Sequence, residues 1–212
     1  MKVDNLKIGL VDADLLDGGT RHPNLALLKI AGFLKDNNIP FELIENENIN
    51  IYDYTRIYVS KVFTFTQEPL FLRNARKNNT LDNIEWGGTG YYGEDDPKDV
   101  FIKLREEDMS KLDNDYFLLQ FPNHRGGRKM GIDMAHQMPY YDLYKDYIDK
   151  KIAMGKKPTY FKDYMNYSIG FLTRGCFRKC PFCVNRLEHK VLPYSELNWF
   201  LDNERDENGK LI

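Results

Sequence analysis

Apolar runs of strand length and one helical pattern dominate the first part of the chain. Residues 8–11 are apolar and are followed by acidic residues, which predicts a buried parallel strand near 6–12 with its carboxyl end at a loop. Between Pro23 and Asn37, leucine, isoleucine and phenylalanine recur at roughly helical spacing, and a first helical turn tolerates proline. One amphipathic helix is therefore expected after the first strand.

Three further strands are expected from β-branched and aromatic residues. They lie at 41–44, 57–63 and 84–86, and the last leads into glycines at 87–90, where the backbone can adopt a positive φ or approach a partner closely. The order of strand, helix and strands indicates a small α/β layer of parallel strands.

The second half of the chain has a weaker pattern. Residues 92–166 are rich in charged residues and tyrosine, and they predict a connector with some helix. Residues 167–173 again have the composition of a strand, and Ser195 can cap a helix that continues through Leu201. This strand and this helix flank a loop that contains every cysteine of the chain.

The composition is that of a folded protein without a strong charge bias. Hydrophobic residues make up 42% and the formal charge is -2, so there is no global positive field to hold a nucleic-acid backbone or an anionic membrane. No segment approaches the roughly 18 apolar residues that span a bilayer, and the amino terminus carries acids where a signal peptide needs an apolar run. We expect a cytoplasmic protein with neither a membrane nor a nucleic-acid partner.

The three cysteines lie close together. Cys176, Cys180 and Cys183 fall within eight residues, in a loop bent by Gly175 and Pro181. An odd number of cysteines cannot all pair with one another, and a reducing cytosol disfavours disulfides. Thiolates are soft ligands that suit zinc or iron-sulfur clusters, and three of them leave one metal position open to a substrate or cofactor.

The spacing C-x-x-x-C-x-x-C, with the aromatic Phe182 just before the third cysteine, resembles the signature of the radical S-adenosylmethionine superfamily. The resemblance implies that Cys176, Cys180 and Cys183 hold a 4Fe-4S cluster whose open iron chelates S-adenosylmethionine. It implies that the backbone at Phe182 lies against the adenine. It also implies reductive cleavage of the cofactor to a 5'-deoxyadenosyl radical, with an electron donor such as flavodoxin or ferredoxin, on a substrate that stays unknown.

The front half of the chain resembles the cobalamin-binding-like domain that precedes the barrel in one branch of the superfamily. The helix start at 23–26 and the glycine turn at 87–90 carry this resemblance. The D-x-H-x-x-G motif that ligates cobalt in many cobalamin proteins is absent, because the corresponding loop from Asp12 to His22 contains DADLLDGGTRH. The resemblance therefore leaves cobalamin as a second cofactor without its usual cobalt ligand.

The expected fold is α/β, with a small Rossmann-like parallel sheet, a connector and the first βα unit of a partial radical S-adenosylmethionine barrel. The predicted division is 1–95 for the sheet domain, 96–165 for the partly helical connector and 166–212 for the start of the barrel. Only 29 residues follow Cys183, whereas such a barrel needs on the order of 200 or more in total. The chain is thus expected to stop early in the barrel, and catalysis by this chain alone is not predicted.

Two other interpretations of the cysteines stay open. A structural zinc site needs a fourth ligand, and His189 could supply it, with five residues between it and Cys183. A non-catalytic module with a Cys3His zinc site is therefore the alternative function. The third interpretation is that the cysteines are buried thiols without a ligand. The other histidines, His22, His124 and His136, have no metal-ligand spacing and receive no role.

Overall fold

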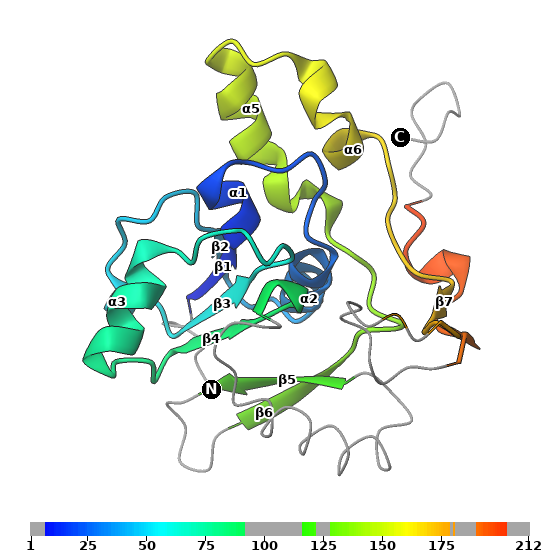
Figure 1. The fold of residues 1–212 in the computed structure, drawn as a ribbon, viewed down its shortest axis with the longest axis horizontal. Helices are drawn as coiled ribbons and strands as arrows, with labels where there is room; N and C mark the ends of the chain where they lie inside the picture. Colours follow the sequence, from blue (N-terminus) through cyan, green and yellow to red (C-terminus); the bar gives the residue numbers. More distant parts are fainter. Residues whose placement is uncertain (1–6, 92–115, 122–127, 179, 181–189, 203–212) are drawn as a thin grey trace.

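The computed structural model describes residues 7–91, 116–121, 128–178, 180 and 190–202. Its centre is a four-stranded parallel sheet in the order β2-β1-β3-β4 (Figure 1). The strands are β1 (Ile8–Asp12), β2 (Phe41–Leu43), β3 (Arg56–Ser60) and β4 (Ile84–Gly87). This arrangement confirms the expected Rossmann-like α/β sheet, and all four of its strands lie where the apolar runs predicted them.

The third strand is shorter than the expected 57–63. Every residue of β3 is buried, and the strand pairs with β1 from Arg56 to Ser60. Beyond that point the backbone N–H groups of Val62 and Phe63 donate to the carboxylate of Asp14 instead of to a neighbouring strand. The Asp14 side chain, from the first turn of α1, therefore takes the place of a neighbouring strand beyond the end of β3, which a local pattern could not predict.

Three α-helices accompany the sheet. The expected helix is α2 (Leu25–Asp36), and Asn24 caps it by accepting a hydrogen bond from the Leu27 N–H, so Pro23 precedes the helix. The short α1 (Ala13–Asp17) forms where a loop was expected, because Asp12 caps it in the same way. The third helix, α3 (Leu70–Asn78), was not predicted. Two single-turn 3₁₀ helices, η1 (Ile51–Asp53) and η2 (Thr89–Tyr91), complete this part.

Both faces of the sheet are buried, because side chains alternate along each strand. Leu10 and Tyr58 pack on the face covered by α2, whereas Val59 packs on the opposite face with Leu72 of α3. Cover on both faces explains why the central strands β1 and β3 are buried at every residue, whereas the edge strands β2 and β4 alternate between apolar and acidic residues.

The region between β4 and the cysteines contains an antiparallel hairpin and a helical unit. The hairpin pairs β5 (Tyr116–Phe121) with β6 (Arg128–Asp133), and neither strand was predicted. The helical unit consists of η3 (Tyr141–Tyr144), α5 (Lys145–Ala153), η4 (Pro158–Phe161) and α6 (Lys162–Met165). Figure 1 shows α5 and α6 beside α1, at the carboxyl end of β1. No helix within the described ranges is both long and apolar enough to cross a membrane.

The helical unit shares one core with the sheet. Tyr144, Ile148, Phe161 and Tyr164 are buried in the same apolar cluster as Leu10. The segment before the unit also touches α2, where the N–H of Tyr140 donates to the Leu28 carbonyl at 2.9 Å. The division at residues 95 and 165 stays a prediction.

The last segment differs most from expectation. The strand predicted over 167–173 is only β7 (Thr173–Arg174), and it pairs antiparallel with β8 (Leu192–Pro193). The helix expected after Ser195 is the single turn η5 (Leu197–Trp199), which begins after Glu196. Both predictions were therefore wrong in extent, and the described residues contain no parallel strand that would begin a barrel.

Candidate functional site

The cysteine loop begins directly after β7. Gly175 has a φ of +91°, a backbone conformation that residues with a side chain rarely adopt. It marks the turn that follows the strand. Cys176 and Cys180 are both half-buried and form no disulfide. The sulfur of Cys176 accepts a hydrogen bond from the Arg178 N–H at 3.4 Å. Two thiols are therefore available to a metal at the start of the loop.

The remaining predicted site residues lie outside the described residues. Cys183, the adenine-contacting Phe182 and the alternative zinc ligand His189 all fall within 181–189. Among the residues that the structure does describe, no three His, Cys, Asp or Glu side chains are grouped so that they could hold a metal ion. The convergence of three sulfurs on one cluster stays a prediction.

The two stems of the cysteine loop, residues 167–175 and 190–202, are joined at several points. Beyond the β7–β8 pair, the N–H of Tyr194 donates to the Leu172 carbonyl at 2.9 Å. Farther from the loop, the N–H of Asp202 donates to the Ser168 hydroxyl at 2.9 Å. The loop is thus closed at its base, which limits the conformations open to the cysteines.

Tyr141 of η3 clamps both stems. Its hydroxyl accepts a hydrogen bond from the Ile169 N–H at 3.0 Å and donates to the Phe200 carbonyl. Burial raises the pKa of Tyr141, which keeps the hydroxyl protonated and able to donate. Gly170 lies against the ring of Phe200, since a Cβ there would come within 2.2 Å of a ring carbon.

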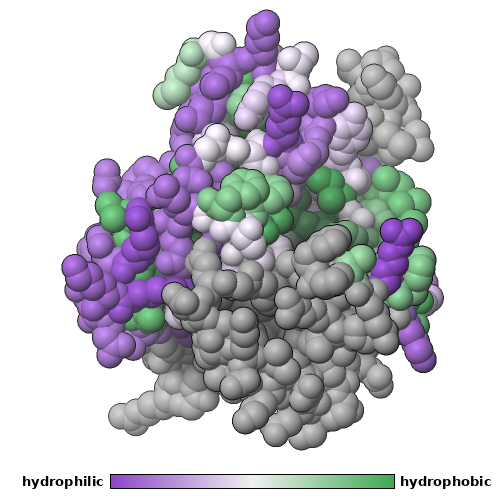
Figure 2. Space-filling model, viewed as in Figure 1, coloured by the Kyte–Doolittle hydropathy of each residue, from purple (hydrophilic) through white to green (hydrophobic). Residues whose placement is uncertain are grey.

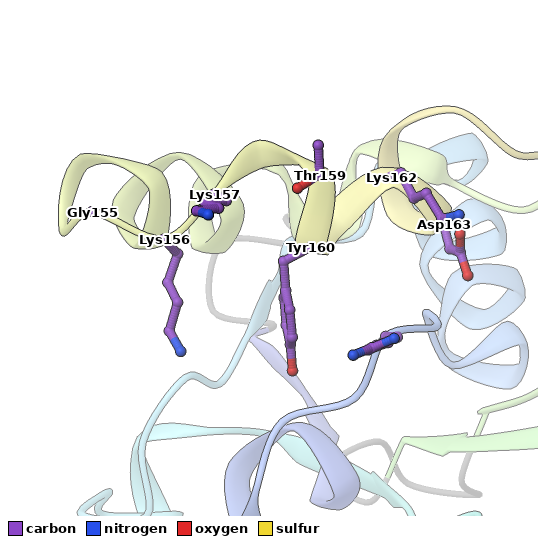
Figure 3. A pocket seen from close by; sticks show the side chains of 8 residues that line it. Gly155, Lys156, Lys157, Thr159, Tyr160, Lys162 and Asp163 are labelled. Atoms are coloured by element: carbon purple, nitrogen blue, oxygen red, sulfur yellow. The ribbon is translucent and has the colours of Figure 1, made fainter.

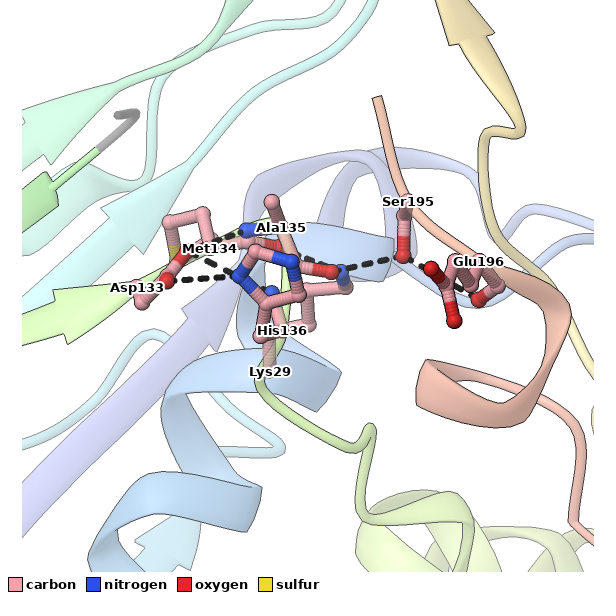
Figure 4. A network of polar contacts seen from close by, with 7 residues as sticks. All are labelled: Lys29, Asp133, Met134, Ala135, His136, Ser195 and Glu196. Atoms are coloured by element: carbon pink, nitrogen blue, oxygen red, sulfur yellow. Dashed lines mark hydrogen bonds and ion pairs between the residues drawn. The ribbon is translucent and has the colours of Figure 1, made fainter. Parts of the chain in front are cut away.

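A polar network ties the second stem to the turn that follows β6 (Figure 4). The Ser195 hydroxyl donates to the Ala135 carbonyl at 2.6 Å. Beside it, Asp133 Oδ2 lies 2.7 Å from His136 Nδ1, and the His136 ring packs edge-on against Trp199 with 5.2 Å between centroids. Because Ser195 donates to a backbone carbonyl, this network orients the stem and does not activate a nucleophile.

The charges around this turn are balanced by local contacts. Although burial acts the other way, hydrogen bonds from His136 and the Ala135 N–H lower the pKa of Asp133. Lys29 of α2 is buried and donates to the Met134 carbonyl (Figure 4). Burial lowers the pKa of Lys29, and the negative charge of Asp133 opposes that shift. The turn after β6 is thus held from both α2 and the cysteine-loop stem.

Large apolar side chains are exposed on the two stems and at the start of the cysteine loop. Phe177 is 73% exposed, Leu192 is 59% exposed, and Phe171, Leu172 and Val191 are also exposed. Figure 2 shows hydrophobic residues gathered on the side of the molecule that carries β7. A concentrated apolar surface beside two thiols is typical of a site that a ligand or another polypeptide segment covers.

A second polar cluster lies at the carboxyl edge of the sheet, between β1 and β3. Doubly wound sheets bind ligands at the point where the strand order reverses, and here that point lies beside β1. The position is filled by side chains of the chain itself. The Tyr144 hydroxyl donates to Asp12 at 2.8 Å and accepts from the Asn24 N–H at 3.2 Å, and Asn24 donates to the Ser60 hydroxyl at 2.8 Å.

Burial strongly affects the two ionisable groups of this cluster. Burial raises the pKa of Asp12 to about 6, although the hydrogen bond from Tyr144 acts in the opposite direction. Burial and the nearby Asp12 charge raise the pKa of Tyr144 well above its usual value. Asp12 is therefore a buried carboxyl whose pKa lies well above that of an exposed aspartate.

Asp14 and the glycine turn hold the loop after β3. Asp14 accepts hydrogen bonds from the Thr66 hydroxyl and from the Val62 N–H, the latter at 2.7 Å. Gly88 has a φ of +105°, and a Cβ there would lie 2.3 Å from the Lys61 carbonyl oxygen. The glycine at 88 is therefore required by a close approach within the chain itself.

Comparison with known proteins identifies no relative. No protein-family model matches the chain, no curated protein matches it, and neither does any solved structure. The α/β class therefore rests on the sheet itself, and any function must be argued from the residues.

The tyrosines that organise both sites were not predicted from the sequence. Tyr141 clamps the cysteine-loop stems, Tyr144 fills the edge of the sheet, and Tyr147 packs against the same core. The three follow one another at intervals of three residues, which is the spacing of one helical face. That periodicity was the signal available in an otherwise charge-rich segment.

Proposed function

We propose that this chain is the amino-terminal part of a cytoplasmic radical S-adenosylmethionine enzyme, with Cys176, Cys180 and Cys183 as ligands of one 4Fe-4S cluster. The observation that carries the proposal is the C-x-x-x-C-x-x-C spacing with Phe182 before the third cysteine. Two features of the described residues support it. Cys176 and Cys180 are half-buried free thiols, and they follow the turn at Gly175 at the base of a closed loop.

The chemistry of the bound group would be reductive cleavage of S-adenosylmethionine to a 5'-deoxyadenosyl radical. An electron donor such as flavodoxin or ferredoxin would be the partner, and the substrate stays unknown. The chain's own contribution is to hold three thiolates in one loop and to shield them from water. The exposed apolar side chains of Phe177 and Leu192 are suited to that second role once a covering segment or ligand is in place.

The residues at the switch point of the sheet do not fit cobalamin as they stand. The loop after β1 lacks the histidine motif that ligates cobalt, and Tyr144, Asn24 and Ser60 occupy the switch point of the sheet. A cobalamin site would require these side chains to move or would lie elsewhere.

The second candidate is a zinc-closed interaction module, favoured by His189 in the position of a fourth ligand. Anaerobic reconstitution with iron and sulfide, with zinc offered in competition, separates the two. The proposal expects a brown protein with about four irons per chain. A colourless protein with one tightly held zinc would overturn it in favour of the interaction module.

Variants of the ligands sharpen this test. We expect Cys180→Ala to lose the cluster, because three thiolates leave no spare ligand. His189→Ala is the matched control, since it should leave the iron content unchanged but weaken a Cys3His zinc site. Full iron content in Cys180→Ala would refute the ligand assignment. Broadening or a shift of the reduced cluster's electron paramagnetic resonance signal on addition of S-adenosylmethionine would test the open iron.

A further inference from the structure

A pocket of about 410 Å³ lies on the carboxyl side of β1 (Figure 1), and none of its lining residues belongs to the cysteine loop. Its walls are the loop that follows α1 and the segment that joins α5 to α6 (Figure 3). The lining residues are Arg21, Gly155, Lys156, Lys157, Thr159, Tyr160, Lys162 and Asp163. A volume of this size falls in the range of small-molecule sites, and the carboxyl side is where sheets of this class bind ligands.

The pocket is strongly basic. Four of its lining residues are cations, namely Arg21, Lys156, Lys157 and Lys162. Asp163 is the one acid among the lining residues, and its carboxylate lies 2.7 Å from His22 Nδ1. The molecule as a whole carries a formal charge of -2, so this concentration of positive charge is local. A concave surface lined by one sign of charge focuses its potential on an oppositely charged ligand.

Tyr160 organises two of these cations. The Arg21 guanidinium lies 5.8 Å and the Lys156 Nζ lies 5.6 Å from the centre of its ring. Figure 3 shows Lys156 and Tyr160 extending from the α5–α6 segment toward the loop opposite. Cation-π contacts of this kind limit the freedom of long side chains, so less conformational entropy is lost when a ligand binds.

The backbone around the pocket is also fixed. Gly155, with a φ of +95°, ends α5, and the Lys156 N–H donates back to the Lys151 carbonyl at 3.0 Å. The opposite wall is tied to α6, because the Tyr164 hydroxyl donates to the Thr20 carbonyl at 3.2 Å. The two lysines at 156 and 157 are thus placed by a helix end and not by a free loop.

We propose that this pocket binds a small phosphorylated metabolite. Guanidinium and ammonium groups form charge-assisted hydrogen bonds with phosphate oxygens, and the Thr159 hydroxyl adds a neutral donor. The half-buried ring of Tyr160 offers an aromatic surface for the rest of the ligand. The inference does not depend on the cysteine loop or on the function proposed for it.

Calorimetric titration of the full chain with adenosine monophosphate and with pyrophosphate tests the proposal. We expect both to bind at one site, and Lys156→Ala with Lys157→Ala to weaken each by about tenfold or more. The matched control removes the same charge elsewhere, through Arg73→Ala with Lys77→Ala on the exposed side of α3, and should leave both affinities unchanged. Tyr160→Leu should weaken the nucleotide more than pyrophosphate.

Three outcomes would overturn the proposal. One is the absence of saturable binding by either phosphate compound. Another is an equal loss of affinity in the lysine double variant and in the α3 control variant. That result would mean that binding depends on the overall charge of the protein and not on this pocket. The third is tighter binding of citrate than of both phosphate compounds, which would make the pocket a polycarboxylate site. Circular dichroism of each variant confirms that the fold is retained.

Discussion

The parallel sheet and the stems of the cysteine loop are both built from short strands, but they are stabilised differently. All five residues of β1 and of β3 are buried, whereas both residues of β8 are exposed. The sheet is held by apolar burial on two faces. The stems are held mainly by hydrogen bonds, several of which come from Tyr141, Ser168 and Ser195.

This difference indicates which region of the chain depends on a ligand or partner for its stability. The sheet shares a core with the helical unit, and its packing is accounted for without a ligand. The stems and the first residues of the cysteine loop combine a two-residue strand pair with exposed apolar side chains and two free thiols. A bound cluster or zinc ion would supply the stabilisation that this region lacks, because metal binding contributes directly to folding free energy.

The largest contrast is expected between two phenylalanines. Phe161 is 2% exposed in the sheet core and Phe177 is 73% exposed on the cysteine loop. We expect Phe161→Ala to lower the free energy of unfolding by about 3–5 kcal/mol, because it removes a buried ring and leaves a cavity. Phe177→Ala should change it by no more than about 0.5 kcal/mol. Chemical denaturation measures both, and similar losses would contradict the difference between the two regions.

A smaller contrast is expected in the pH dependence of stability. The pKa of Asp12 is raised to about 6, so the folded chain holds a proton on Asp12 at pH values where the unfolded chain has released it. Stability is then lost as the pH rises from about 4 to about 6, by roughly 2–3 kcal/mol. Asp133 has the opposite effect, because its pKa is lowered. Its contribution to the free energy of unfolding is present at higher pH and is lost as the pH falls through that pKa.

Substitutions separate these two carboxyl groups. Unfolding curves of Asp12→Asn, recorded across this pH range, should lack the loss seen in the unsubstituted chain. Asp133→Asn should keep that loss and remove part of the destabilisation at lower pH. An unchanged pH profile in Asp12→Asn would show that the buried carboxyl is not responsible.

Two glycines provide the smallest contrast. A Cβ at Gly32 of α2 would lie 2.1 Å from the Met138 backbone oxygen, whereas a Cβ at Gly170 would meet the ring of Phe200 at 2.2 Å. A ring can shift more easily than packed backbone. We therefore expect Gly32→Ala to cost about 2–3 kcal/mol and Gly170→Ala about 1 kcal/mol. Thermal unfolding compares the two, and a larger effect at Gly170 would mean that the stem is more tightly packed than the sheet.

The strands of the sheet could be predicted because burial leaves short stretches of apolar, β-branched and aromatic residues in the sequence, most continuous in β1. Their ends could not. Strand β3 does not reach the predicted residue 63 because Asp14 accepts the backbone N–H groups of Val62 and Phe63. The expected helix after Ser195 is reduced to one turn, since the Ser195 hydroxyl that would have capped it donates to Ala135. The strand predicted over 167–173 is shortened for a similar reason, because the Tyr141 hydroxyl accepts a hydrogen bond from the Ile169 N–H.

The sequence by itself determined the α/β class, the positions of the four parallel strands and α2, and the spacing that groups the cysteines. These features depend on local periodicity and on neighbouring residues, which the chain displays directly. Tertiary structure alone decided that Tyr144 fills the edge of the sheet, that Tyr141 closes the cysteine-loop stems, and that cations from two distant segments line one pocket. Such contacts join residues as far apart as Asp12 and Tyr144, separated by 132 positions, and no local pattern encodes which partners will meet.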